Sequence, residues 1–283
     1  MAISIRPAVA ADAAACGAIL YRAFQALAES HNFPPDFPSI DVATGLLSML
    51  LASPGFYAVV AEDEGRIGSN FADQRSQIAG IGPISVDPMV QNQGVGRSLM
   101  QAVVDHFAAR NFPGIRLVQA AYHNRSLCLY TKLGFRTREP LSVIQGPPLN
   151  AKLLGYEVRP ATKEDIAACN LLCRRVHGFD RDGELRDAID AKTARVVEHM
   201  GRITGYAGDI AFFAHAVAET NQALEALIGA RAFPGPGFLL PTRNHEVFEW
   251  CLDRGLRLVM QTTLMTIGLY NEPAGAYLPS VLY

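Results

Sequence analysis

A turn with two glycines, QNQGVG, holds the residues best suited to chemistry in this sequence. The stretch GPISVDP before it predicts a strand, and the apolar spacing after Gly94 predicts a helix to about Arg110. The first turn of such a helix attracts anions through its free N–H groups and the positive end of its dipole. Gly94 and Gly96 lack a Cβ, so a phosphate can come close to the backbone. The side chains that can add hydrogen-bond donors there are Gln91, Asn92, Gln93, Arg97 and Ser98.

Two familiar phosphate-binding patterns do not fit this turn. The P-loop pattern is absent, because Arg97 and Ser98 follow only a short G-V-G. The dinucleotide pattern G-x-G-x-x-G fails at Leu99, and no acidic residue ends the following strand. A bare G-x-G also occurs in strand-to-helix turns that bind nothing. The turn alone therefore leaves its ligand open.

The wider spacing, G-P-x-x-V-x-P-x-x-Q-x-x-G-x-G from Gly82 to Gly96, resembles motif A of the GNAT superfamily of acyl-CoA-dependent N-acetyltransferases. The resemblance implies that the turn binds the pyrophosphate of coenzyme A. It also implies that the backbone of Ser85 and Val86 pairs with the pantetheine arm. The implied pyrophosphate site comprises Gln91, Asn92, Gln93, Gly94, Val95, Gly96, Arg97 and Ser98.

A second segment, NRSLCLYTKLGF, resembles the next GNAT motif, in which Leu127 replaces the usual alanine. The matching residues are Asn124, Leu129, Tyr130, Lys132, Gly134 and Phe135. We expect Asn124 to lie in the cofactor site and to cap the following helix. We expect Gly134 to end that helix in the left-handed conformation.

The resemblance places Tyr130 beside the sulfur of the thioester. When an amine attacks the thioester, a thiolate leaves, and a phenol with a pKa of about 10 can protonate it. The alternative is that Tyr130 is an ordinary half-buried core residue. The base for the amine is open among His123, Glu62 and Asp87, and strand N–H groups near Ser85 could stabilise the oxyanion. A covalent route through Cys128 is less favoured, since that thiol falls in the expected helix core.

A local excess of basic residues is consistent with a nucleotide phosphate. The segment from Val86 to Arg138 contains seven basic residues and only two acidic ones, Asp87 and Asp105. The basic residues are Arg97, Arg110, Arg116, Arg125, Lys132, Arg136 and Arg138. Such a surface would attract the 3′-phosphate of coenzyme A. The alternative is a set of solvated side chains without a ligand.

The elements that must hold these motifs alternate between strands and helices. Strands are predicted at about 3–6, 56–62, 66–73, 78–86, 114–123 and 135–144, and helices at about 12–30, 41–52, 94–110 and 125–133.

The start of this series recurs in the second half of the sequence. ISIRPAVAADAAACGAILYR and YEVRPATKEDIAACNLLCRR align at an offset of 153, with Arg6, Pro7, Asp12 and Cys16 among the identities. This repeat predicts two homologous halves.

The two prolines in QGPPLNAKLLG interrupt any regular element, so we place the boundary there, with domains at residues 1–148 and 149–283. The second half has Thr220, which looks like an N-cap, where the glycine turn would be, and Cys251 where Tyr130 would be. It therefore resembles a degenerate GNAT domain that shapes the acceptor pocket or stabilises the first half. The ending NEPAGAYLPSVLY is apolar, so we expect it to dock across the halves, where the Tyr283 carboxylate could serve as a base.

Composition restricts the class further. A net charge of −2 disfavours a general nucleic-acid binder. No run reaches the roughly 18 to 20 apolar residues that cross a bilayer, and the start lacks the pattern of a signal peptide. Five cysteines without a C-x-x-C pair indicate reduced thiols in a cytoplasmic protein. Cys169 and Cys173 are expected to be buried hydrophobes, and no metal site is expected.

These features predict an α/β (α+β) fold of two tandem GNAT-like domains, each a mixed, mostly antiparallel central sheet flanked by helices. The expected activity is transfer of an acetyl or similar acyl group from acetyl-CoA to a primary amine of a small molecule or peptide, by direct attack in a ternary complex. Nucleic acid and membrane are not expected partners, and a homodimer is left open. The alternative function is a non-enzymatic CoA-binding or sensing module, and an unrelated nucleotide-binding α/β domain is a more distant one.

Overall fold

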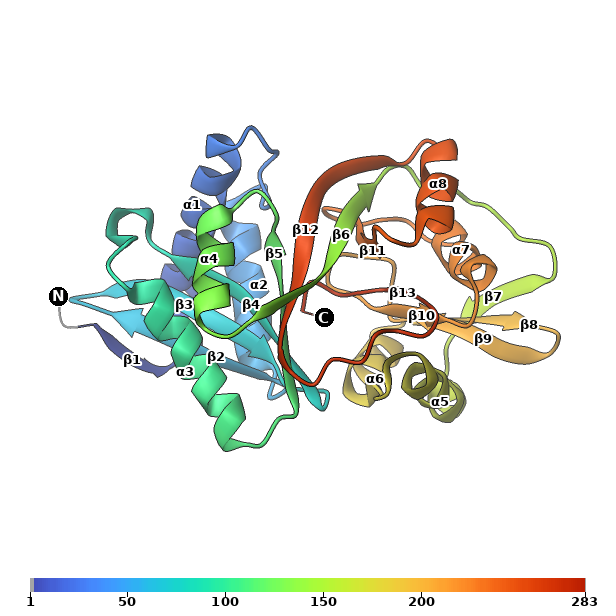
Figure 1. Ribbon diagram of the computed structural model, residues 1–283, viewed down its shortest axis with the longest axis horizontal. Helices are drawn as coiled ribbons and strands as arrows, with labels where there is room; N and C mark the ends of the chain where they lie inside the picture. Colours follow the sequence, from blue (N-terminus) through green and yellow to red (C-terminus); the bar gives the residue numbers. More distant parts are fainter. Residues whose placement is uncertain (1–2, 283) are drawn as a thin grey trace.

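The computed structural model describes residues 3–282, and its first half contains the predicted series of elements (Figure 1). In order these are β1 (Ser4–Pro7), α1 (Ala13–Ser30), α2 (Ile40–Ala52), β2 (Phe56–Glu62), β3 (Arg66–Asp73), β4 (Ile78–Val86), α3 (Val95–Ala109), β5 (Gly114–Ala120), α4 (Asn124–Lys132) and β6 (Arg136–Gln145). The predicted strand over 114–123 is shorter, because the chain turns after Ala120 to enter α4.

The second half repeats this order. Its elements are β7 (Tyr156–Pro160), α5 (Ile166–His177), α6 (Asp182–Asp190), β8 (Arg195–His199), β9 (Arg202–Ala207), β10 (Ala216–Ala218), α7 (Asn221–Gly229), β11 (Phe238–Pro241), α8 (His245–Asp253), β12 (Arg257–Gly268) and β13 (Ala276–Leu278). No described helix is long and apolar enough to cross a membrane.

The repeat extends to an ion-pair network at the start of each half. In the first half the Arg6 guanidinium binds Asp12 at 2.8 Å and Glu62 at 2.7 Å. In the second half Arg159 binds Asp165 at 2.8 Å and Glu198 at 2.6 Å. Each aspartate also accepts a backbone N–H at the turn before its helix. The shared R-P-A…D pattern thus encodes the same strand-to-helix entry twice.

The two halves exchange strands. One sheet has the order β1-β2-β3-β4-β5-β12-β6-β11, and a second sheet has the order β13-β10-β9-β8-β7. β12 of the second half lies between β5 and β6, while β6 of the first half lies between β12 and β11 (Figure 1). β6 and β12 hold equivalent places in the repeat, each directly after the last helix of its half. The eight-stranded sheet therefore continues across the proposed boundary near residue 148.

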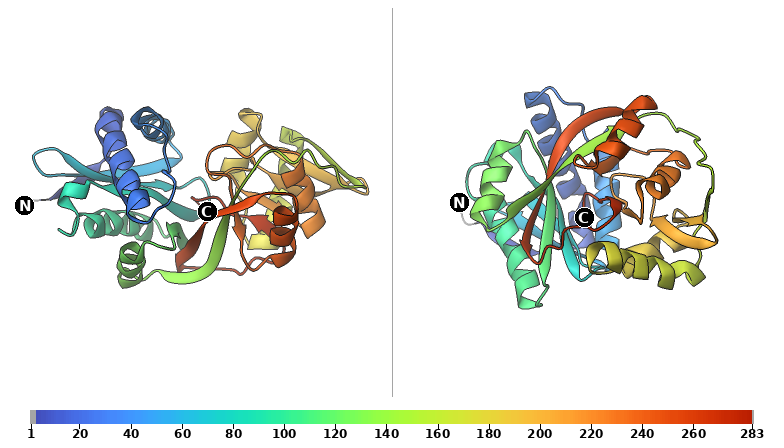
Figure 2. Two further views of the ribbon diagram at one scale, coloured as in Figure 1. Left: turned by 90° about the horizontal axis from the view of Figure 1, so that it is seen from above. Right: turned by 45° about the vertical axis from the view of Figure 1, so that its right-hand side comes forward.

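Helices cover both faces of this mixed, mostly antiparallel architecture, as predicted. In the first half α1 and α2 lie on one face of the sheet, and α3 and α4 lie on the other (Figure 2). A separate apolar cluster fills the junction of the halves and includes Ile78 of β4, Leu141 of β6, Leu239 of β11 and Leu264 of β12. This junction cluster joins the halves by apolar packing as well as by strand pairing.

Candidate active site

β4 and β5 form the only parallel strand pair among the described residues, and they separate halfway along. Their pairing runs from Ile78 opposite Gly114 to Ile81 opposite Leu117. From Gly82 to Val86, β4 pairs only with β3 on its other side, as far as residues 3–282 show. The split leaves backbone groups of β4 open to a ligand beside Ser85 and Val86. This arrangement suits the predicted binding of an extended arm.

The predicted glycine turn begins α3 directly beyond this split. Gly94 is the N-cap with φ +88°, and an added Cβ would meet open space, so backbone conformation is what requires glycine there. No side chain caps the helix. Its first N–H groups therefore remain available to an anion.

The structure brings the two predicted motifs together at Gly96. A Cβ on this residue would lie 3.7 Å from a methyl of Val86 and 3.7 Å from a methyl of Leu129. The first turn of α3 is thus in contact distance of both the end of β4 and α4. Gln91 adds a second link, since its amide donates to the carbonyl of Val86 at 3.3 Å and accepts from Arg125 at 3.4 Å.

The other residues predicted to donate hydrogen bonds to the phosphate differ in solvent exposure. Asn92, Gln93 and Arg97 are exposed beside the turn, where they can reach a ligand. Val95 is buried, so only its backbone N–H can contribute. The Ser85 side chain is also buried and lies 3.4 Å from the Ser69 hydroxyl, which leaves its backbone as the contact group.

Tyr130 faces the interior from α4. It is 7% exposed and shares an apolar cluster with Ile81 and Leu117, the last pair before the split. Burial raises the pKa of the phenol to about 12. Within residues 3–282 no partner is found for its hydroxyl. It therefore stays protonated near neutral pH.

Other expectations for α4 need correction. The N-cap is His123, and Asn124 is the exposed first residue of the helix, because the chain turns one residue earlier than expected. Ser126 stabilises this start by donating to the His123 carbonyl at 2.9 Å. Cys128 is exposed rather than in the core. Gly134 ends the helix with φ +96°, as predicted.

Two of the three candidate bases are engaged elsewhere. Glu62 belongs to the Arg6 network, and hydrogen bonding by Arg6 lowers its pKa. Asp87 binds Arg22 at 2.7 Å and caps the turn before the glycines, and its pKa is also lowered. His123 makes no such ion pair with any of the described residues. Burial, with help from Arg125, lowers the pKa of its imidazole, which favours the neutral form that accepts a proton.

Sequence reasoning missed a carboxylate near the end of β5. Asp36 lies in the loop between α1 and α2, and burial raises its pKa to about 6. Its charge also contributes to the raised pKa of Tyr122, on which Phe33 stacks with ring centroids 4.3 Å apart. The loop sequence SHNFPPDFPS indicated only a proline-rich connection. No local signal could show that it folds onto β5.

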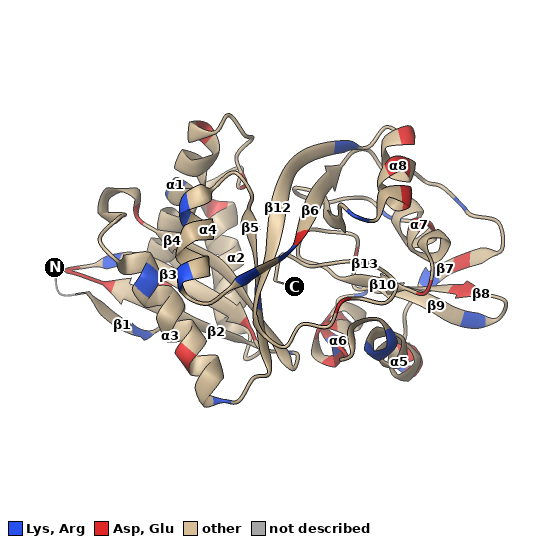
Figure 3. Ribbon diagram, in the orientation of Figure 1, with Lys and Arg blue, Asp and Glu red and all other residues tan. Residues whose placement is uncertain are grey.

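The basic residues counted from the sequence do not form one surface. Arg97, Arg125 and Lys132 are exposed on α3 and α4 (Figure 3). Arg116 is fully buried at the junction, with its guanidinium 5.0 Å from the ring of Tyr270. A separate cavity of about 330 Å³ is lined by Gly134, Arg136, Arg138, Thr266 and Gly268. Only part of the counted charge can therefore meet a phosphate at α3.

The second half closes the place where the first half is split. β13 pairs with β10 from Ala216 opposite Leu278 to Ala218 opposite Ala276. The Thr220 side chain caps α7 by accepting from Ala223, as expected, and no glycine stands there. Cys251, at the place of Tyr130, is buried. A strand of the chain itself thus occupies the edge that would receive an extended ligand.

The end of the chain returns to the first half. The Val281 N–H donates to the Phe212 carbonyl at 2.8 Å, and Leu282 lies against Gly80 and Gly82 of β4. Ile78 of the same strand belongs to the junction cluster, whereas Ala79 and Ile81 face α3. Leu282 therefore covers β4 on the face away from α3, where the split begins. The proposed carboxylate of Tyr283 lies outside the described residues.

Comparison with known proteins agrees with this architecture. Residues 54–137 match the acetyltransferase (GNAT) domain family, a range that includes the glycine turn and Tyr130. No curated protein matches the sequence. The match confirms the predicted GNAT family for residues 54–137, which lie in the first half.

Two solved structures share the fold over nearly the whole chain. One is a protein from Pyrococcus horikoshii assigned as an acetyltransferase, with 17% identity, a TM-score of 0.71, and coverage of 97% of this chain and 94% of that one. The other is a GCN5-related N-acetyltransferase from Sphaerobacter thermophilus, with 15% identity, a TM-score of 0.60, and coverage of 95% and 96%. Both halves thus belong to one GNAT-like fold.

Proposed function

We propose that this protein transfers an acetyl group from acetyl-CoA to a primary amine at the split between β4 and β5. The observation that carries the proposal is the meeting of Val86, Gly96 and Leu129, with Tyr130 buried on the same helix as Leu129. In this proposal the region combines an anion site, an open strand edge and a phenol. The matching GNAT domain family supports the same assignment.

In this proposal the turn from Gln91 to Ser98 binds the pyrophosphate and β4 binds the pantetheine arm. The amine nitrogen attacks the carbonyl carbon of the thioester, so that a C–N bond forms and the C–S bond breaks. Tyr130 gives its proton to the leaving sulfur, and a base takes the proton from the amine. His123 and Asp36 are the candidate bases, since both lie by the end of β5 and can accept a proton near neutral pH.

The second half is proposed to close the acceptor side rather than to catalyse. In the second half, β13 fills the edge of β10 where an extended ligand would bind. The terminal segment of the second half covers β4 on the face away from α3. An amine acceptor, either a small molecule or a peptide, would then meet surfaces from both halves.

The test uses the full chain. We expect acetyl-CoA, but not NAD or ATP, to raise the melting temperature, and we expect thiol release from acetyl-CoA with at least one member of an amine panel. Stabilisation without thiol release for any amine would favour the alternative of a CoA-binding or sensing module. The absence of any shift with acetyl-CoA would refute both readings.

A further inference from the structure

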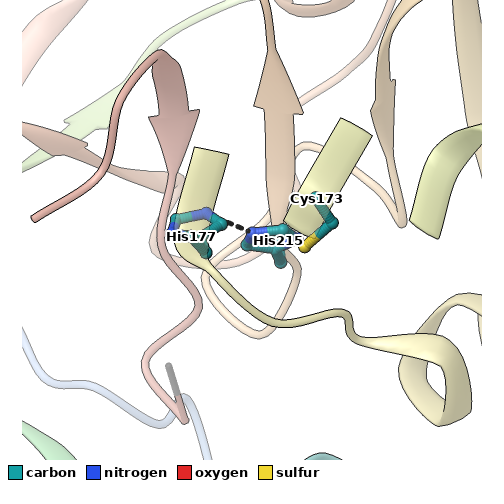
Figure 4. A group of neighbouring side chains, drawn as sticks. All are labelled: Cys173, His177 and His215. Carbon is teal, nitrogen blue, oxygen red and sulfur yellow. Dashed lines mark hydrogen bonds between the residues drawn. The ribbon is translucent and has the colours of Figure 1, made fainter. Parts of the chain in front are cut away.

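Three side chains with metal-binding atoms converge inside the second half, away from the proposed active site (Figure 4). Cys173 and His177 lie four residues apart on α5, so they share one face of the helix. His215 reaches them from the residue before β10. The Cys173 sulfur and one ring nitrogen of each histidine all lie within 4.8 Å of one another.

The spacing of the two imidazoles suits a shared ion. Their Nε2 atoms are 3.2 Å apart and share a hydrogen bond, which a bound ion would replace (Figure 4). Two nitrogens bound to one tetrahedral zinc ion at about 2.0 to 2.1 Å would be about 3.3 Å apart. A zinc ion can therefore bind both with little movement, and the Cys173 sulfur lies within 4.8 Å of a ring nitrogen of each histidine.

The site is closed to solvent. Cys173, His177 and His215 are 0%, 2% and 3% exposed, respectively. Polar side chains placed this deeply are normally held by partners that use their donor atoms. Thiolates and imidazoles are good ligands for zinc, whereas calcium and magnesium prefer oxygen ligands. One thiol and two imidazoles therefore favour zinc.

A fourth polar atom points to the same place. Tyr206 of β9 is 2% exposed, adjoins the Cys173 thiol, and has its ring centroid 5.9 Å from that of His215. Its buried hydroxyl is in hydrogen-bonding reach of the Cys173 thiol, and residues 3–282 provide no nitrogen or oxygen partner for it. An ion between these groups would give the Tyr206 oxygen a role as fourth ligand.

The surrounding charge permits a cation. The nearby guanidinium of Arg181 is bound to the Glu184 carboxylate at 2.5 Å. A cysteine thiolate would add one negative charge at the site itself. The ion would thus replace the thiol proton, and the Glu184 carboxylate would offset the charge of Arg181.

We propose that Cys173, His177 and His215 bind one zinc ion, with Tyr206 completing the site. The ion would tie α5 to β9 and to the start of β10. His177 ends α5, and Phe179 just beyond it packs in the junction cluster with the first half. The site would therefore fix the part of the second half that meets the acetyltransferase domain. No metal was predicted, and Cys173 was expected to be a buried hydrophobe. His215 follows His177 by 38 residues, so no short ligand pattern marks this cluster.

The test begins with full-length protein that carries no histidine tag. We expect about one zinc ion per chain by elemental analysis after addition of zinc and removal of the excess. Cobalt(II) should give a thiolate-to-cobalt charge-transfer band that saturates at one equivalent and disappears when zinc is added. Protein that binds neither ion would overturn the proposal without any need for a variant.

Variants then assign the ligands. Cys173→Ser should abolish the charge-transfer band, and His215→Ala should lower the affinity for cobalt at least tenfold. Cys169→Ser is the matched control, because Cys169 lies one turn earlier on α5, is equally buried and is outside the cluster. Equal loss of the band in Cys169→Ser would refute the site. Should a variant fold poorly, chelation of the wild type decides: its melting temperature should fall and recover with zinc, and an unchanged value would contradict the proposal.

Discussion

The backbone carbonyl of Leu282 occupies the space that a side chain on Gly80 would need. A Cβ on Gly80 would lie 1.6 Å from this oxygen, far inside any allowed contact. Two residues separated by more than two thirds of the chain are therefore in direct contact on β4. The contact ties the end of the second half to the strand that opens the proposed active site.

Gly80→Ala should expel the terminal segment from β4. We expect a loss of about 3 kcal/mol in unfolding free energy, since overpacking against backbone cannot be relieved by a rotamer change. Denaturant unfolding measures the loss. Removing residues 282 and 283 from the variant should restore part of the stability, and Gly45→Ala, whose Cβ meets open space in α2, is the control. Equal destabilisation with and without the last two residues would show that the contact is not responsible.

Gly94→Ala should weaken acetyl-CoA binding. The residue has φ +88°, and an alanine there is unfavourable by about 1 to 2 kcal/mol, so the first turn of α3 would shift. We expect the KM for acetyl-CoA to rise at least tenfold, with a smaller change in kcat. Gly235→Ala has the same kind of backbone strain in an open loop of the second half and should leave KM unchanged. A similar rise in both variants would argue against the turn as the phosphate site.

Tyr130→Phe should lower kcat by about a hundredfold if the phenol protonates the thiolate. The melting temperature should hardly change, because the hydroxyl has no partner among residues 3–282 and the ring keeps its packing. Steady-state kinetics and thermal unfolding of the same preparation separate these effects. Tyr156→Phe in the second half serves as the control. An unchanged kcat would leave Tyr130 as a core residue only.

If Asp36 is the catalytic base, the pH–rate profile should show an acidic limb. Burial raises its pKa to about 6, so activity that needs the carboxylate as a base should rise as the pH increases through about 6. Asp36→Asn should remove this limb and lower the plateau. The exposed Asp41→Asn variant should keep both. A limb that persists in Asp36→Asn but disappears in His123→Gln would assign the base to His123 instead.

Asp12 should stabilise the fold in a pH-dependent way. Hydrogen bonds from Arg6 hold its pKa well below the ordinary value of about 3.9. Its contribution is therefore complete above pH 3.9 and is lost as the pH falls through the lower, folded-state pKa. Asp12→Asn should cost about 3 kcal/mol at pH 7, and the difference from wild type should shrink in acid. Asp165→Asn should behave alike, whereas the exposed Asp253→Asn should have only a small effect on stability.

Much of the local structure could be predicted because its signals span few residues. Apolar periodicity places α3, Gly134 ends α4, and the pattern from Arg6 to Asp12 marks a helix entry that recurs at Arg159. The N-cap of α4 was placed one residue too late, since both His123 and Asn124 can occupy such a position. The glycine turn and Tyr130 were candidates for the same reason, because each motif lies within one turn or helix.

By itself the sequence determined the repeated halves, the family and the residues of the proposed cofactor site. Only the tertiary structure decided that β12 inserts between β5 and β6, that β13 pairs with the edge of β10, and that Leu282 lies on Gly80. It also decided that His215 meets Cys173 and His177. The physical reason is range: caps and helical periodicity act between neighbours in the chain, whereas strand partners and buried clusters depend on which distant surfaces pack best together.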